Sequence, residues 1–405
     1  MIKIEIDDIA SLQQAYFQRV EPAVSFRLRV LQRVLGHLQG APILLPDPDI
    51  RSVSTAARDI VNMVPGFTED IAKFHSGEYM ATISRLIASG YPANYFDLSL
   101  VLGLVDDLLD HSKDLLFQLL TCPPGDLWTF HKGLISKYRL SEPAIKALTL
   151  GVDYGYPNIN RAIKDFFAAH PLVIVCPYCN AKDAAFVADL AGGQAALPQL
   201  DHFCSQADFP LLSCSLFNLV PTDTDCNGTI NKGDFEFKEE FHLNPYDDGF
   251  GQDLKFEAVF KFPKKDAVEI RLNVGTATAL EKRKRMIGNE PGVTEKTKLG
   301  NANVFSLYSN YNTESLWEDA GNVYRMINKT ASGVRGLARF FRQMSGSYEE
   351  AYKAWYESNL LKKFHRKDFN KKKYAKLFRD LHDDYYTKDK RRRNNFIREI
   401  ISADS

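Results

Sequence analysis

The chain has 405 residues, of which 45% are hydrophobic and 25% are charged. This is the composition of an ordinary globular protein, with room for two or three domains and a well-buried core. Its 51 basic and 51 acidic side chains cancel, which excludes binding of nucleic acid through overall charge and leaves only local basic patches for that purpose.

The cysteines and the first residues bear on the cellular compartment. Three of the six cysteines have the spacing of metal ligands, which argues against a disulfide framework and for a reducing compartment. The opening sequence MIKIEIDDIA lacks the basic and apolar regions of a signal peptide, and no apolar run is long enough to cross a bilayer. We therefore expect a cytoplasmic protein without a membrane partner.

Residues 1–150 are predicted to be mostly helical. Apolar residues recur at helical spacing in Leu12–Phe17 and in Phe26–Leu38, and we expect Pro22 to break this run and Gly40 to end it. Two further helices are expected over Thr68–Ala88 and Asn94–Leu120, the second stopped by the sequence CPPG.

The next predicted helices lead toward the middle of the chain. One begins at Ser141, with Pro143 in its first turn, where a missing N–H does no harm. Residues 160–169 form an amphipathic helix that should pack against the segment following it, and His170 and Pro171 should end it.

The last third of the chain is predicted to contain a β-hairpin and further helices. Phe256–Phe262 and Val268–Val274 alternate apolar and polar residues around the sequence PKKDA, which is typical of a hairpin. Leu280–Leu299 is interpreted as a charged connector, and the chain from Asn303 onward as helical.

An acidic pattern in the helix expected over Asn94–Leu120 needs separate interpretation. Asp106, Asp107 and Asp110 have the DDxxD spacing that binds Mg²⁺ and diphosphate in isoprenoid synthases. Those enzymes need a second aspartate-rich helix, and the sequence has none. We interpret the three residues as an acidic helix face.

Residue types that carry chemistry are concentrated between Cys176 and Asp247. The sequence CPYC contains Cys176 and Cys179, and the sequence LDHF places Asp201 and His202 at the end of a predicted strand. The later elements are Asn218 in NLVP, then Asp223, Cys226 and Asn227 in DTDCN, then KGD, and finally FHLNPYDD.

In this order and spacing, residues 170–250 resemble the HNH family of endonucleases. The resemblance implies a small ββα-metal core, and the fold as a whole is then α+β, with a mainly α-helical scaffold around that core. It also implies that His202 is the general base, that Asn218 braces the loop carrying the base, and that Asp201 and Asn227 hold Mg²⁺ or Mn²⁺. These residue types suit phosphodiester hydrolysis, because imidazole titrates near neutral pH and carboxylates bind hard cations. The alternative for Asp201 and His202 is a capped turn beside a core histidine.

Many members of this family brace the motif with a structural zinc held by two cysteine pairs. The second pair here begins with Asp223 in place of a cysteine, so the resemblance implies a weakened zinc site of Cys176, Cys179, Asp223 and Cys226. Two alternatives remain open: Cys214 could replace Asp223 as a ligand, or the knuckle could hold no zinc.

Two groups of residues are candidates for contact with nucleic acid. His242 and Asn244 lie where relatives carry a His-Pro-Tyr segment, and they are expected at most to line a groove. Residues 351–405 contain an excess of eight basic over acidic side chains, which is what phosphate contacts require. The residues expected to make these contacts are Lys388, Lys390, Arg391, Arg392 and Arg393. The alternative is a solvated helix end with inward-pointing aromatic side chains, which are Tyr374, Phe378, Tyr385 and Tyr386.

The sequence therefore predicts a metal-dependent endonuclease acting on DNA, with RNA as the other possible substrate. We expect a helical extension over residues 1–150, the nuclease core over 151–250 and a basic C-terminal region over 251–405. The helical tail is similar to that of bacterial anti-phage nucleases of the Septu type, which work beside a separate ATPase. The chain has no GxxxxGK[ST] sequence, so ATP hydrolysis of the P-loop kind would need that partner. The alternative is a catalytically silent nucleic-acid-binding or scaffolding subunit.

Overall fold

The computed structural model describes residues 1–42, 48–62, 84, 88, 98–184, 198–229, 231–233, 235–260, 268–288, 299–331, 348–360, 362 and 364–388. In this part of the chain the fold is mixed α+β, with many helices and two small two-stranded sheets. The predicted helix over Thr68–Ala88 lies almost wholly outside the described residues.

The chain forms two compact units. The helical unit comprises Asp7–His170 and His202–Leu219, and the knuckle unit comprises Met1–Ile6, Pro171–Asp201 and Val220–Ser405. The division passes between Asp201 and His202, so it does not follow the expected boundaries after residues 150 and 250.

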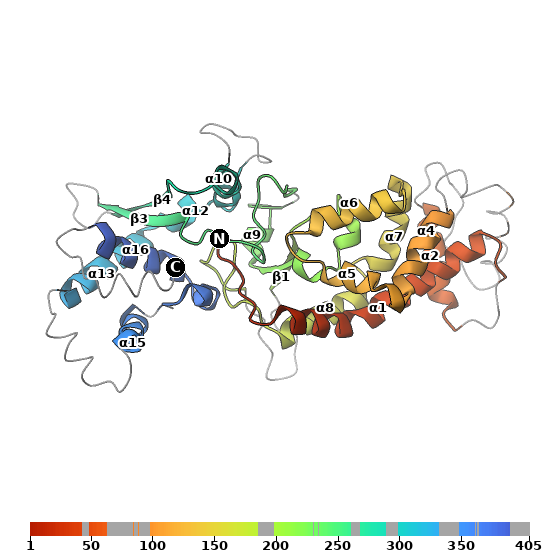
Figure 1. Cartoon of the computed structure of the whole chain (residues 1–405), viewed down its shortest axis with the longest axis horizontal. Helices are drawn as coiled ribbons and strands as arrows, with labels where there is room; N and C mark the ends of the chain where they lie inside the picture. The colour runs from red at the N-terminus through yellow and green to blue at the C-terminus, as the bar shows by residue number, and fades with distance from the viewer. Residues whose placement is uncertain are drawn as a thin grey trace. The chain divides into compact units, whose positions relative to one another are not determined.

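The helical unit is built around one long helix, α1 (Ile9–Leu38), drawn in red in Figure 1. The other helices of this unit are α2 (Ile50–Asn62), α4 (Leu98–Leu109), α5 (Leu115–Thr121), α6 (Leu127–Lys137), α7 (Glu142–Val152), α8 (Pro157–Ala169) and the 3₁₀ helices η2 (His111–Lys113), η3 (Pro210–Leu212) and η4 (Leu216–Asn218). Helices α2, α4, α5, α7 and α8 all contact α1, so α1 is the centre of this unit.

Helix α1 continues through Pro22, so the predicted break there is wrong. A proline inside a helix costs about 3 kcal/mol because it removes a hydrogen bond and clashes with the preceding turn. The side chains of Val20, Val24 and Leu28 on either side are fully buried, and burying such side chains stabilises by about 1.5–3 kcal/mol each. Packing therefore outweighs the local cost. The predicted end is confirmed, since Gly40 follows the helix with a φ of 94°.

The predicted helix over Asn94–Leu120 is interrupted, and the described part of it forms α4, η2 and α5. The Asp110 side chain accepts a hydrogen bond from the Ser112 backbone N–H at 3.0 Å, and Asp114 adopts a left-handed φ of 52°. Short polar side chains compete in this way with the helical hydrogen bonds. Two aspartates therefore end α4 and start a new helix.

The helices before the motif form as the sequence predicts. Ser141 caps α7 by accepting from the Ala144 N–H, and Pro143 lies in its first turn. Helix α8 ends at Ala169 with His170 as its C-cap. It packs against α1, where the rings of Tyr16 and Phe166 meet edge to face at 4.9 Å.

The knuckle unit contains the strands and the C-terminal helices. Its elements are β1 (Gln199–His202), β2 (Leu219–Thr222), α9 (Thr224–Asn227), β3 (Leu254–Phe260), β4 (Val268–Val274), α10 (Leu280–Ile287), α11 (Asn301–Val304), α12 (Leu307–Tyr311), α13 (Glu314–Ala331), α15 (Tyr348–Leu360), the 3₁₀ helix η6 (Arg366–Lys371) and α16 (Ala375–Lys388). Strands β1 and β2, each of which has one end residue in the helical unit, form one sheet.

Strands β3 and β4 form the predicted hairpin. They pair antiparallel from Leu254 opposite Val274 to Phe260 opposite Val268. Helix α16 packs on β3, and α13 packs on β4 and α16 (Figure 1). The expected connector over Leu280–Leu299 instead begins with helix α10, which ends at Ile287 and is capped by Gly288 with a φ of 92°.

The described helices also bear on the membrane prediction. None of them combines the length and apolarity that a bilayer span requires.

Candidate metal centre and the motif residues

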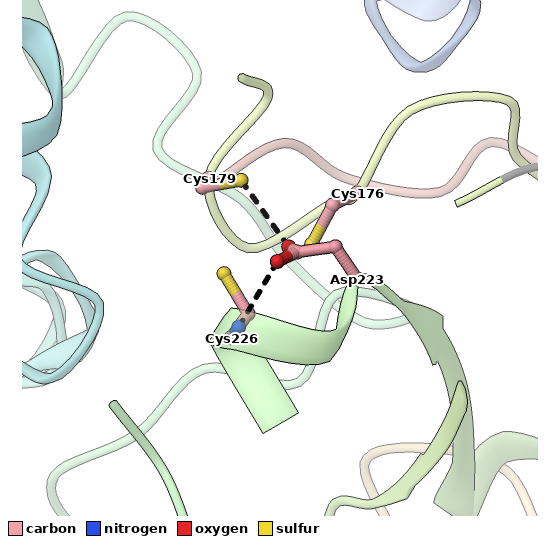
Figure 2. A group of neighbouring side chains, drawn as sticks. All are labelled: Cys176, Cys179, Asp223 and Cys226. Carbon is pink, nitrogen blue, oxygen red and sulfur yellow. Dashed lines mark hydrogen bonds between the residues drawn. The ribbon is translucent and has the colours of Figure 1, made fainter. Parts of the chain in front are cut away.

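Four residues of the motif converge on one buried site in the knuckle unit. Cys176 and Cys179 come from the loop that the Val175–Asp183 bridge closes, and Asp223 and Cys226 come from the start of α9. One ligand atom from each of the four lies within 4.8 Å of every other, and all four residues are buried (Figure 2). This group could hold a metal ion.

Asp223 has a different task for each of its carboxylate oxygens. Oδ1 caps helix α9 by accepting from the backbone N–H groups of Asp225 at 2.9 Å and Cys226 at 3.1 Å. Oδ2 turns toward the thiols and lies 3.5 Å from Cys179 Sγ (Figure 2). A cysteine at this position would offer a sulfur ligand but would be a poor cap.

The crowding of four acidic groups changes their proton affinities. Burial raises the pKa of Cys176 and of Asp223, whereas hydrogen bonds with Cys176 and Cys226 lower the pKa of Cys179 to about 4. The Ala181 backbone N–H also points at Cys179 Sγ, at 3.4 Å. A cation bound among these four groups would favour loss of their protons.

Cys214, the alternative fourth ligand, lies elsewhere. Its Sγ donates to the Val152 carbonyl at 2.7 Å within the helical unit. Burial raises its pKa to about 12. It belongs to the packing between α7 and η3, and Asp223 takes the fourth position of the metal group.

Asp201, the expected ligand of the catalytic metal, is buried in the knuckle unit with only 4% of its surface exposed. Its Oδ1 accepts from the Lys232 ammonium at 2.6 Å, and its Oδ2 accepts from the Tyr178 hydroxyl at 2.6 Å. Tyr178 lies between the two cysteines of the CPYC loop. Both oxygens of Asp201 thus have a strong donor.

Asn227, the second expected ligand, ends helix α9 and is partly exposed. Its amide donates to Gln199 Oε1 at 2.9 Å. Gln199 and Asp201 are two residues apart on β1, so their side chains leave the strand on the same face. Asn227 is therefore tied to the face of β1 that also carries Asp201.

His202 belongs to the helical unit and is partly exposed. Its Nε2 lies 2.9 Å from the carbonyl oxygen of Ser213, and its ring meets Tyr154 edge to face at 5.2 Å. Because a carbonyl oxygen only accepts, Nε2 must carry the proton. In the neutral ring Nδ1 is then the nitrogen that can take a proton, as a general base requires.

Asn218 is fully buried in the same unit and holds the loop that follows His202. Its Oδ1 accepts from the Cys204 N–H at 2.6 Å, and its Nδ2 donates to the carbonyls of Cys204 at 3.2 Å and Leu212 at 3.0 Å. Its own carbonyl accepts from the Phe203 N–H at 2.8 Å. These contacts are those of a brace for the residues after His202.

The expectation that His242 and Asn244 line a groove is wrong, since both are buried. His242 stacks on Phe237 at 4.4 Å and its Nδ1 accepts from the Lys238 N–H, and burial lowers its pKa to about 4. The Asn244 Oδ1 accepts from the Tyr246 N–H at 3.0 Å. Both residues stabilise the turn of the FHLNPYDD sequence.

The DDxxD aspartates have local protein partners. Asp106 accepts from Gln32, Asp107 pairs with Lys113 and with the Tyr138 hydroxyl, and Asp110 caps η2. Hydrogen bonds from Lys113 and Tyr138 lower the pKa of Asp107. This pattern supports the interpretation as a structural acidic face.

The C-terminal basic residues are only partly described. Lys390 and Arg391–Arg393 lie outside the described residues, and Lys388 ends α16. Within α16 the aromatic side chains of Phe378, Tyr385 and Tyr386 are buried, while Tyr374 just before it is partly exposed. Two cationic side chains of α16, Lys376 and Arg379, are also buried. Lys376 pairs with Asp380 and Arg379 pairs with Asp383, both at 2.7 Å. These two cations are not placed to contact phosphate.

A basic segment that the sequence analysis counted only within the charge excess of residues 351–405 lies directly on the cysteine loop. This segment, residues 362–373, has seven basic side chains and one acidic side chain. Asn180, which follows Cys179 with a left-handed φ of 54°, donates to the carbonyls of Phe369 at 2.9 Å and Lys372 at 3.4 Å. Its Oδ1 accepts from the Lys376 N–H at 3.1 Å. In the sequence, the only indication of this segment was its run of basic residues.

The charge of this segment is only partly compensated. Lys371 pairs with Asp368 and Lys373 with Asp183, each at 2.6 Å. Lys367 and Lys372 are exposed, and among the described residues neither makes an ion pair. The knuckle unit therefore presents positive charge beside its metal group.

No protein-family model matches the chain, and neither a curated protein nor a solved structure matches it. The function of the site therefore has to be inferred from its own geometry and from the motif.

Proposed function

We propose that the chain is a metal-dependent endonuclease of the HNH type that hydrolyses phosphodiester bonds of DNA. The observation that carries the proposal is the convergence of Cys176, Cys179, Asp223 and Cys226 on one buried group. The residues with the expected catalytic roles lie in sequence between these two pairs or directly after them. This convergence supports the proposal, because a knuckle of cysteine and aspartate ligands is the brace that the motif resemblance implies.

Zinc is the metal that we propose for the knuckle. Three thiols and a carboxylate suit a tetrahedral zinc site, and zinc bonds of about 2.3 Å to sulfur place neighbouring ligands roughly 4 Å apart. The observed limit of 4.8 Å between ligand atoms is compatible with that size. The carboxylate makes the site weaker than one with four cysteines, because thiolate is the softer donor.

His202 is the proposed general base and takes the proton of the attacking water on Nδ1. The Ser213 carbonyl supports this role, because it fixes the proton on Nε2. Asn218 is the positioning residue, since it holds the backbone of Cys204 and Leu212 in the loop after the base.

Asp201 and Asn227 are the proposed holders of a Mg²⁺ or Mn²⁺ ion, and their oxygen atoms fit a hard cation. When bound, the ion would supply positive charge for the phosphate and the departing oxygen. In the present structure the place of a cation at Asp201 Oδ1 is taken by the Lys232 ammonium.

Nucleic-acid binding is proposed for the basic segment, with the undescribed tail residues Lys390–Arg393 as an extension of it. Exposed lysines supply phosphate contacts without reading sequence. The hydrogen bonds of Asn180 fix this segment on the cysteine loop, so a bound backbone would lie beside the metal group. The similarity of the helical tail to that of Septu-type nucleases supports a role in anti-phage defence beside a separate ATPase.

A second candidate function is supported by the contacts of Asp201. A buried carboxylate that is already neutralised by Lys232 is typical of a structural ion pair. In that case the chain would be a catalytically silent nucleic-acid-binding or scaffolding subunit that keeps the knuckle.

The experiment that separates the two is a cleavage assay with purified full-length protein. Supercoiled plasmid and a structured RNA are incubated with Mg²⁺, Mn²⁺ or EDTA, with and without any ATPase encoded beside the gene and ATP. A nuclease nicks or linearises its substrate only with the divalent ion. Binding to both substrates without cleavage under every condition would favour the silent subunit.

A further inference from the structure

The ion pair between Asp201 and Lys232 is the most buried one that touches the motif. The two side chains are 4% and 3% exposed, and the distance from Lys232 Nζ to Asp201 Oδ1 is 2.6 Å. Surface ion pairs are mobile and weak, but a buried pair cannot lose one member without leaving an uncompensated charge. Loss of either side chain alone would therefore destabilise the fold more than loss of one member of a surface ion pair.

Lys232 is held in this position by its own surroundings. Its backbone N–H donates to the Cys226 carbonyl at 3.2 Å, which anchors the lysine to the end of α9. Its ammonium lies 4.6 Å from the centre of the Phe237 ring, a cation–π contact. Gly233 has a φ of 52°, and its N–H closes the turn onto Gly228.

The other oxygen of Asp201 is fixed by Tyr178. The ring of Tyr178 stacks on Phe305 at 4.2 Å, and its hydroxyl donates to Asp201 Oδ2 at 2.6 Å. Tyr178 and Lys232 together hold the Asp201 carboxylate in one orientation. A divalent ion at Asp201 must replace the ammonium at Oδ1, because Mg²⁺ requires an oxygen ligand at about 2.0–2.1 Å.

We propose that Lys232 is a built-in counter-ion that competes with the divalent ion for Asp201. Without metal it neutralises the charge of the buried carboxylate and holds it in place; when the ion binds, the ammonium has to leave Oδ1. This inference rests on the proposed function, because it takes Asp201 to be a ligand of the catalytic ion.

Competition of this kind links metal binding to substrate binding. A displaced ammonium needs a new anion, and a phosphate of the nucleic acid is an anion that a lysine binds readily. A bound oligonucleotide should thus raise the affinity for the divalent ion, and the ion should raise the affinity for the oligonucleotide by the same factor.

The test is the affinity for Mn²⁺, measured from the free-ion electron paramagnetic resonance signal on zinc-saturated, full-length protein. Lys232→Gln removes the charge but keeps an N–H donor for Asp201, so it is the charge-removing variant expected to disturb the fold least. It should bind Mn²⁺ about tenfold more tightly than the wild type, since a charged neighbour in contact changes the cation affinity of a carboxylate by factors of this order. Lys232→Arg keeps the charge and should bind Mn²⁺ as weakly as the wild type.

A second measurement uses thermal unfolding, which needs no nucleic acid. Added Mn²⁺ should raise the melting temperature of Lys232→Gln far more than that of the wild type or of Lys232→Arg. Tyr178→Phe removes the neutral donor from Oδ2 and serves as the matched control, and it should not tighten Mn²⁺ binding.

The outcomes distinguish this inference from the proposed function. If Asp201→Asn abolishes Mn²⁺ binding while Lys232→Gln binds no more tightly than the wild type, the competition is refuted and the metal ligand stands. If Asp201→Asn leaves Mn²⁺ affinity unchanged in both the wild type and Lys232→Gln, Asp201 is no metal ligand, and the proposed site fails together with the inference.

Discussion

Asp223 shows how one side chain serves both the local fold and a metal group. One oxygen caps α9 and the other faces Cys179. The sequence alone placed Asp223 in the position of a missing cysteine, because the spacing to Cys226 is that of a metal-binding pair. Its capping role was not foreseen, since it depends on where α9 begins.

Substitutions at Asp223 should therefore separate the two tasks. Asp223→Asn keeps a good N-cap but loses the charge, so zinc content should fall from about one per chain with little change in the melting temperature of the metal-free protein. Asp223→Cys should bind zinc more tightly, while its metal-free form loses about 1 kcal/mol of stability with the cap.

Zinc content by mass spectrometry and calorimetric melting with and without zinc measure both effects. Wild-type protein that carries no zinc after purification without chelator, and melts at the same temperature when zinc is added, would refute the metal assignment.

The pairing of Asp201 with Lys232 could not be predicted from the sequence. The two residues are 31 positions apart, and a lysine in a loop is ordinarily exposed. Only the turn after α9 brings Lys232 back onto the strand. The four-residue metal group was predictable for the opposite reason: cysteines at fixed spacing have few alternative uses in a reducing compartment.

At the scale of elements, hydrophobic periodicity predicted α8 and the β3–β4 hairpin, and Ser141 with Pro143 in the first turn predicted the start of α7. Periodicity failed where the local preference of a residue and the packing of the folded chain favour different backbone structures. Pro22 should end a helix, but the buried side chains around it keep α1 continuous. Two features separate α4 from α5: the hydrogen bond from the Ser112 N–H to the Asp110 side chain and the left-handed backbone of Asp114. No hydrophobic pattern indicates either of them.

Asn180 should control the attachment of the basic segment to the cysteine loop. Asn180→Gly removes the three side-chain hydrogen bonds and should lower the free energy of unfolding by about 2 kcal/mol. Asn180→Ala removes the same bonds and adds the strain of a left-handed alanine, which is worth about 1 kcal/mol more.

Urea denaturation gives both values, and the glycine variant is the control for backbone strain. Equal stability of Asn180→Gly and the wild type would mean that these hydrogen bonds do not hold the segment in place.

Buried histidines, among them His131, His242 and His382, make the stability of the whole molecule depend on pH. Burial lowers the pKa of His131 and His242 to about 4 and also lowers that of His382. Their unfolded pKa is about 6.5, so below that pH the unfolded state binds more protons than the folded state. Stability should be complete above pH 6.5 and fall between pH 6.5 and 4, by up to about 1.4 kcal/mol per pH unit for each histidine.

Urea denaturation at pH 7.5, 6 and 5 measures this decrease. His242→Gln should reduce the slope, and substitution of the exposed His111 by Gln should leave it unchanged. A stability that stays constant from pH 7.5 to 5 would contradict the burial of these three side chains.

Nucleic-acid binding should depend on the uncompensated lysines of the basic segment. The double variant Lys367→Ala and Lys372→Ala should weaken binding equally for all sequences. It should also reduce the log–log salt slope by about 0.9 for each phosphate of duplex DNA that the protein no longer neutralises. Lys132→Ala with Lys146→Ala, two exposed lysines of the helical unit, is the matched control.

Fluorescence anisotropy at several salt concentrations gives the slopes. The same slope for the basic-segment variant and the wild type would show that this surface does not meet phosphate.

The most direct test of the nuclease assignment is the cleavage rate of His202→Ala with saturating Mg²⁺ or Mn²⁺. Loss of a general base lowers the rate by about 10²–10⁴, and a partly exposed ring contributes less to the stability of the fold than a buried one. The variant should therefore melt near the wild-type temperature and bind DNA with unchanged affinity, while His111→Ala cleaves at the wild-type rate. Cleavage by His202→Ala at the wild-type rate would contradict the account.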